Sequence, residues 1–193
     1  MSCRFQIALQ LDSNNAATYS HRGYCWRKLG DFPRAIDDYS HALELEPTNV
    51  KTLNNRGYCF AKSGQYDEAI HDYSEVIAVD PNNAHAYHNR GISYDKKGEF
   101  DAAIRDFTRV LKLDPSNANA HFNRGSTHDS LGQYDKAIED YSRALSLDRQ
   151  QGTHQIDQKA VKSTNNSANV VKSPPRTSTK VSIPENHVKK VAH

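Results

Sequence analysis

Cysteine and long apolar runs are scarce in this chain of 193 residues. It has three cysteines, one methionine and one tryptophan. So few cysteines argue against a disulfide-stabilised secreted domain and favour a reduced, intracellular protein. A transmembrane helix needs about 18 or more consecutive apolar residues, and the sequence has no such run; residues 1–20 also lack the apolar stretch of a secretory signal. We therefore expect a cytoplasmic protein that does not insert into membranes.

Strong charge of one sign is also lacking. The chain has 25 basic and 23 acidic side chains, for a formal charge of +2, so no global field indicates a nucleic-acid partner. The balance hides an asymmetry, because residues 1–149 carry 18 basic and 21 acidic side chains, whereas residues 150–193 carry 7 and 2. The final segment is rich in Ser, Thr, Asn and Lys as well as basic, so we expect residues 152–193 to form a disordered basic tail.

Glycine is infrequent, but eight of the nine glycines recur with a period of 34 residues. They form two series, Gly23, Gly57, Gly91 and Gly125, and Gly30, Gly64, Gly98 and Gly132. Other residue types recur in phase: an arginine, an alanine–isoleucine pair, and an aspartate followed by an aromatic residue. These are Arg22, Arg56, Arg90 and Arg124; Ala35-Ile36, Ala69-Ile70, Ala103-Ile104 and Ala137-Ile138; Asp38, Asp72, Asp106 and Asp140; Tyr39, Tyr73, Phe107 and Tyr141. Such a period is typical of stacked helical hairpins.

The second copy shows why each repeat should be a pair of helices. Apolar residues spaced by three and four predict a first helix from about Val50 to Ser63, which Gly64 would end in the left-handed conformation. A second apolar stripe starts at Tyr66 and stops before Pro81, which lacks an amide hydrogen. The small residues Gly57 and Ala69 would let the two helices of this pair approach each other closely.

These in-phase positions resemble the tetratricopeptide repeat family from about Phe5 to Asp148. The resemblance implies an all-α fold, a right-handed superhelical solenoid of antiparallel helix pairs. We expect repeats at residues 16–49, 50–83, 84–117 and 118–151, preceded at 1–15 by the second helix of an incomplete repeat. The chain would then be a fragment, a splice product or a short member of a longer array. Apolar ends without a polar cap would favour self-association.

In this family the first helices line a concave groove that binds partners. The resemblance places the following residues there: Ser20, His21, Tyr24, Asn54, Asn55, Tyr58, His88, Asn89, Ile92, Phe122 and Asn123. Asn55, Asn89 and Asn123 would form a column, with His21 at the same position of the first copy. Asparagine both donates and accepts, so it can bond a peptide backbone of any sequence, as in arrays resembling glycosyltransferase repeats. Alternatively, asparagine is simply the residue that this repeat favours here.

The arginine of each copy stands where the family most often has leucine. Because every copy also carries the aspartate, we predict Arg–Asp contacts between helices; the alternative is a solvated charged face. A partly exposed pair of this kind would contribute only about 0–1 kcal/mol.

No residues form a catalytic or cofactor-binding pattern, so we expect no enzyme activity and no cofactor. His85, His88 and His121 lack the further ligands of a native metal site. We predict a noncatalytic scaffold that binds a protein or peptide segment, in a cilium-related assembly by resemblance to ciliary scaffolds. The alternatives are a cochaperone, a regulatory fragment of a larger enzyme, and a truncated product that associates through its open edge. Cochaperone repeats bind a carboxylate with cationic groups, which the matching positions here lack. These positions are Ser20, Tyr24, Asn55, His85 and Asn89, or one copy later Asn54, Tyr58, Asn89, Asn119 and Asn123.

Overall fold

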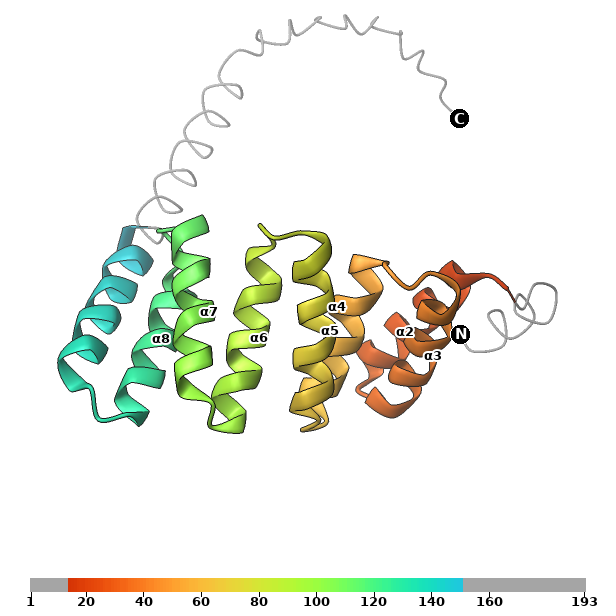
Figure 1. The fold of residues 1–193 in the computed structure, drawn as a ribbon, viewed down its shortest axis with the longest axis horizontal. Helices are drawn as coiled ribbons and strands as arrows, with labels where there is room; N and C mark the ends of the chain where they lie inside the picture. The colour runs from red at the N-terminus through yellow and green to blue at the C-terminus, as the bar shows by residue number, and fades with distance from the viewer. Residues whose placement is uncertain (1–13, 151–193) are drawn as a thin grey trace, which may run out of the picture. The chain divides into compact units, whose positions relative to one another are not determined.

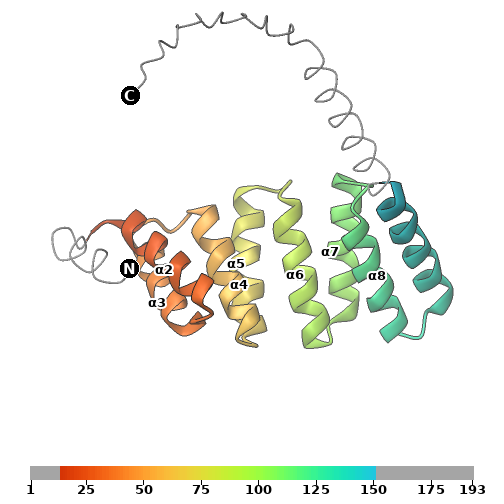
Figure 2. The same cartoon turned by 180° about the vertical axis from the view of Figure 1, so that it is seen from behind.

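The computed structural model describes residues 14–150, and these form an array of eight helices (Figure 1). The labelled helices are α2 (Ala16–Leu29), α3 (Phe32–Leu45), α4 (Val50–Lys62), α5 (Tyr66–Val79), α6 (Ala84–Lys97), α7 (Phe100–Leu113) and α8 (Ala118–Ser130). One more helix occupies residues 134–150. Figures 1 and 2 show the helices side by side in one row, as antiparallel pairs. The predicted all-α array is therefore confirmed. The incomplete repeat and the basic tail fall largely or wholly outside the described residues.

Asparagine and glycine set the ends of the first helix of each pair. Asn15, Asn49, Asn83 and Asn117 precede α2, α4, α6 and α8, and each side chain accepts the N–H three residues later, at 2.8–3.1 Å. Such N-caps each contribute about 1 kcal/mol. After each of these helices lies a glycine with φ between 69 and 84°, a conformation other residues rarely adopt. The predicted helix from Val50 to Ser63 is observed as Val50–Lys62.

Small residues on one helix face an aromatic side chain on the next. A Cβ atom built on Gly91 would lie 2.9 Å from the ring of Phe107, so only glycine lets the two helices approach this closely. Tyr39, Tyr73 and Phe107 are at most 1% exposed, and Ala69 is fully buried. Phe60 and Tyr66, by contrast, are only half-buried. The aspartate–aromatic dipeptide of the second helix therefore supplies the larger part of the core.

The four arginines make buried ion pairs. Arg22, Arg56, Arg90 and Arg124 each donate two hydrogen bonds, at 2.5–2.9 Å, to Asp38, Asp72, Asp106 and Asp140 respectively. The aspartates are only 1–5% exposed. The predicted Arg–Asp contacts are confirmed and the solvated charged face is wrong. The energy expected for a partly exposed pair is also too low, because each carboxylate is buried and bonded at both oxygens.

Three of these arginines also bond the preceding pair of helices. A third guanidinium nitrogen donates from Arg56 to Ser40, from Arg90 to Ser74 and from Arg124 to Thr108, at 3.0–3.1 Å. Each of these arginines thus connects its own pair to the one before it, which fixes the angle between neighbouring pairs.

The first helices of successive pairs converge. α2 contacts α4, α4 contacts α6, and α6 contacts α8, whereas among the described helices α3, α5 and α7 do not contact one another. A row of hairpins that is closer on one side curves toward that side, so α2, α4, α6 and α8 line the inner surface of the array.

Candidate partner-binding groove

All eleven residues predicted for the groove lie on α2, α4, α6 or α8, the helices of the inner surface. His21 and two aromatic residues, Tyr24 and Phe122, are exposed, and the other eight are half-buried. None of the eleven is fully buried, so each presents some of its side chain at the surface.

The asparagines of the predicted column recur at the 34-residue spacing, but their side chains differ in the contacts that they make. Asn123 Nδ2 lies 3.2 Å from His88 Nε2, which joins α8 to α6. Asn89 lines a hollow on the inner surface. His21, at the same position of the first pair, places Nδ1 2.8 Å from the Ala17 carbonyl oxygen of its own helix, so it does not extend the column with an amide group.

A tyrosine pair with an arginine between the rings lies on α2 and α4. The guanidinium carbon of Arg27 lies 5.0 Å from the ring centroid of Tyr24 and 5.2 Å from that of Tyr58. Lys28 and Lys62 each lie over the tyrosine of their own helix, at 5.4 and 5.5 Å. Cation–π contacts of this kind contribute about 0.5–1 kcal/mol each at exposed sites and hold the rings in place.

Next to this pair lies a hollow of about 260 Å³ between α4, α5 and α6. Its lining residues are Tyr58, Ala61, Lys62, Tyr66, Tyr73, Asn89, Ile92, Ser93 and Lys96. The wall is mostly aromatic and aliphatic, with two ammonium groups and one amide among the polar groups. Apolar walls with a few polar groups are typical of sites that bind a side chain of a partner.

Three other residues predicted for the groove form contacts with neighbouring residues of the array. Ser20 Oγ lies 3.2 Å from Thr52 Oγ1, between α2 and α4. Asn54 donates to the Val50 carbonyl of its own helix at 3.0 Å, and its Oδ1 atom is buried with no donor among the described residues. Burial and the neighbouring His85 lower the pKa of His88, whose ring lies 5.7 Å from that of Phe107.

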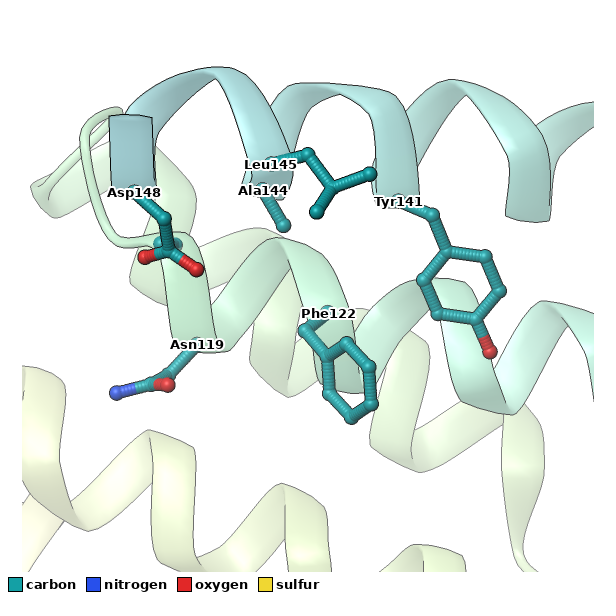
Figure 3. A pocket seen from close by; sticks show the side chains of 7 residues that line it. Asn119, Phe122, Tyr141, Ala144, Leu145 and Asp148 are labelled. Carbon is teal, nitrogen blue, oxygen red and sulfur yellow. The ribbon is translucent and has the colours of Figure 1, made fainter. Parts of the chain in front are cut away.

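Phe122 belongs to a separate hollow of about 490 Å³, formed by α8 and residues 134–150. Its ring centroid is 5.5 Å from that of Tyr141. Figure 3 shows Phe122, Tyr141 and Leu145 pointing into one space, with Asn119 and Asp148 to one side. Tyr141 is half-buried although its equivalents in the other pairs are fully buried. The structure therefore does not bring Phe122 together with the tyrosine pair.

The sequence prediction missed the basic residues of the inner surface, Arg27, Lys28, Lys62 and Lys96. A signal was available, because three of them, Lys28, Lys62 and Lys96, recur at the 34-residue period. Lys28 stands one turn after Tyr24, a position matched to the cochaperone repeats, and the matched positions themselves still carry no cation. The prediction considered only positions already known in the family and so overlooked this series.

Among residues 14–150, no three His, Cys, Asp or Glu side chains are grouped so that they could hold a metal ion. Cys59 is buried, which raises the pKa of its thiol to about 11 and keeps it protonated at neutral pH. No helix within the same residues has the length and apolar character needed to cross a membrane.

Family models match the chain throughout this helical region. Tetratricopeptide repeat models cover residues 16–49, 39–71 and 88–152, and a TPR repeat model covers residues 57–98. The chain is a tetratricopeptide repeat protein. No curated protein sequence matches it.

Solved structures of MamA have the same fold as this tetratricopeptide repeat array. One crystal structure of MamA superimposes with a TM-score of 0.75 at 23% identity, over 77% of this chain and 87% of MamA. MamA 41-end from Desulfovibrio magneticus RS-1 gives 0.74 at 24% identity, over 76% and 83%. MamA MSR-1 gives 0.68 at 22% identity, over 78% and 90%. At this identity the likeness establishes the fold of the array and nothing about its partners.

Proposed function

We propose that this tetratricopeptide repeat protein is a noncatalytic scaffold that binds an extended segment of a partner protein along α2, α4, α6 and α8. The main support for the proposal comes from the inner surface of the array. It presents half-buried amides, exposed aromatic rings and a hollow of about 260 Å³ on helices that converge. A surface built on packed helices needs little ordering when a partner binds, which lowers the entropic cost of binding.

The asparagine column would bind the backbone of the partner segment. Asn55 and Asn89 remain half-buried and can both donate and accept. Asn123 would exchange its contact with His88 for one with the partner. Tyr24, Tyr58 and Ile92 would supply the apolar contact area, since aromatic anchors contribute a large part of the energy at most interfaces.

Affinity capture followed by mass spectrometry tests the proposal. The wild-type chain is compared with the triple variant Asn55→Ala, Asn89→Ala, Asn123→Ala. A matched control carries Asp37→Ala, His71→Ala and Arg105→Ala, which are exposed residues spaced by 34 positions on the second helices. We expect partners to be lost with the asparagine variant and kept with the control. Partners that persist with the asparagine variant would contradict a groove in which these amides take part.

The finer identity of the protein stays a prediction. A cytoplasmic location is predicted from the composition of the sequence, whereas a cilium-related assembly and a particular resemblance to tetratricopeptide repeat protein 6 rest on the sequence resemblance. The cochaperone and enzyme-fragment alternatives, the repeat boundaries and self-association through the ends of the array are likewise predictions. Titration with acidic C-terminal peptides and light scattering over a dilution series address the cochaperone and self-association respectively.

A further inference from the structure

We propose that the α2–α4 end of the groove is a subsite for acidic side chains within an extended partner segment. This inference rests on the proposed function and specifies the chemistry of the partner. The subsite consists of Tyr24, Arg27, Lys28, Tyr58 and Lys62, which the two rings and their cation contacts bring together.

The three cations of this subsite are not paired with carboxylates of the described helices. Among residues 14–150, Arg27, Lys28 and Lys62 form no ion pair, in contrast to the four arginines of the buried pairs. The Arg27 Nε atom is buried with no acceptor among the described residues. Lys28 and Lys62 are exposed. Two exposed ammonium groups and a guanidinium group beside an apolar surface are complementary to a carboxylate.

The local charge is opposite to that of the array. Residues 1–149 carry 18 basic and 21 acidic side chains, so a basic surface on this array is a feature of particular positions. A cluster of cations on a helical array whose net charge is negative attracts an acidic segment to one place rather than to the whole surface.

The charge changes sign along the inner surface. The position of Arg27 is occupied by Ala61, Asp95 and Asp129 in the following pairs. Asp95 accepts a hydrogen bond from Thr127 at 2.8 Å and lies 4.0 Å from Lys96. An acidic residue of the partner would therefore be attracted to α2 and α4 and repelled near Asp129. This polarity fixes the direction in which the segment lies in the groove.

Basic residues near the end of a helix also have a purely structural explanation. Arg27, Lys28 and Lys62 stand in the last turns of α2 and α4, where positive charge interacts favourably with the helix dipole. That role affects stability and does not depend on the acidity of a ligand, so binding measurements distinguish the two explanations.

Selection from a random library of 12-residue peptides on phage tests the proposal, with the full chain immobilised. We expect the selected peptides to contain more Asp and Glu than the library. Fluorescence anisotropy then compares their affinity for the wild type and for Lys28→Gln, Lys62→Gln. We expect at least a tenfold loss of affinity for that variant, and a similar loss when the acidic residues of the peptide are replaced by Gln or Asn. Amidation of the peptide C-terminus should leave the affinity unchanged.

The control variant Arg105→Gln, Lys112→Gln removes the same amount of charge from exposed positions on α7 and should bind like the wild type. If the selected peptides are not enriched in Asp and Glu but bind Tyr58→Ala more weakly than the wild type, the acidic subsite is overturned. The groove proposal then still stands. Peptides that bind the wild type and Tyr58→Ala equally, or a selection that yields no binding peptide, would contradict both. Equal loss in the control variant would show a non-specific charge effect and overturn the subsite.

Discussion

At the scale of single residues, the buried Arg–Asp pairs join the two helices of each pair. In each pair of helices an arginine bonds the carboxylate of an aspartate residue that is at most 5% exposed. Removing one member leaves the other charge without its partner in a site with little water, which costs far more than an exposed pair would contribute.

A double-mutant cycle on Arg90 and Asp106 measures this effect. We expect Arg90→Ala to lower the free energy of unfolding by about 3 kcal/mol, and the double variant to be clearly less destabilised than the sum of the single variants. Chemical denaturation followed by circular dichroism gives the values. Lys97 and Asp67, an exposed pair at 2.6 Å, are the control and should be nearly additive. Strict additivity at Arg90 and Asp106 would contradict the pairing.

The fully buried Ala69 gives a second prediction at this scale. Ala69→Leu places a larger side chain between α4 and α5 and should cost about 1–3 kcal/mol through overpacking. Ala17→Leu, at an exposed position of α2, is the matched control and should change stability little. An unchanged melting temperature for Ala69→Leu would show that the assigned helix faces are incorrect.

The pH dependence of stability tests the surroundings of His88. Burial and His85 lower its pKa, and the neutral Nε2 atom is placed to accept from Asn123 at 3.2 Å. The folded state therefore binds a proton less readily than the unfolded state. The stability from this site is full above the ordinary histidine pKa of about 6.5 and is lost as the pH falls through the lowered value.

We expect His88→Gln to reduce the loss of stability on acidification, measured by thermal unfolding between about pH 7 and pH 5, on either side of the ordinary histidine pKa. His71→Gln, at an exposed position of α5, is the control and should keep the wild-type pH dependence. If His88→Gln also keeps it, protonation of His88 does not determine the acid sensitivity.

At the scale of helices, the sequence predicted most of the fold because its signals are local. The glycines with φ near 80° and the prolines after the second helices mark helix ends, and the apolar periodicity marks the buried faces. The asparagine N-caps recur at the same period, so the starts of the first helices could also be predicted from the sequence. The end of a helix is determined by residues that are neighbours in the sequence. Because each signal recurs in every pair, most of the ambiguity about where the helices end is removed.

The candidate site was harder to predict, because it depends on contacts between helices. Tyr24 and Tyr58 recur at the period, but Arg27 does not, so the repeat pattern gave no reason to place it between their rings. Phe122 was grouped with the tyrosines by its position in the repeat. Its actual neighbours, Tyr141 and Leu145, belong to the last pair, where a position that is buried elsewhere is open.

At the scale of the whole array, the inner surface and the hollow beside Phe122 are two separate surfaces on which a partner could bind. The inner surface combines amides, aromatic rings and cations along several helices. The hollow beside Phe122 is lined mainly by apolar groups at one end of the described region. Binding at the first surface supports a scaffold with a directional groove, whereas binding at the second would indicate association through an apolar face.

Hydrogen–deuterium exchange of the full chain, with and without the tightest-binding selected peptide, distinguishes these surfaces most directly. We predict slower exchange in α2, α4 and α6 when the peptide is bound, with the largest change in α2 and α4, and no change for the variant Lys28→Gln, Lys62→Gln at the same peptide concentration. Slower exchange confined to residues 134–150 would contradict a partner-binding groove on the first helices.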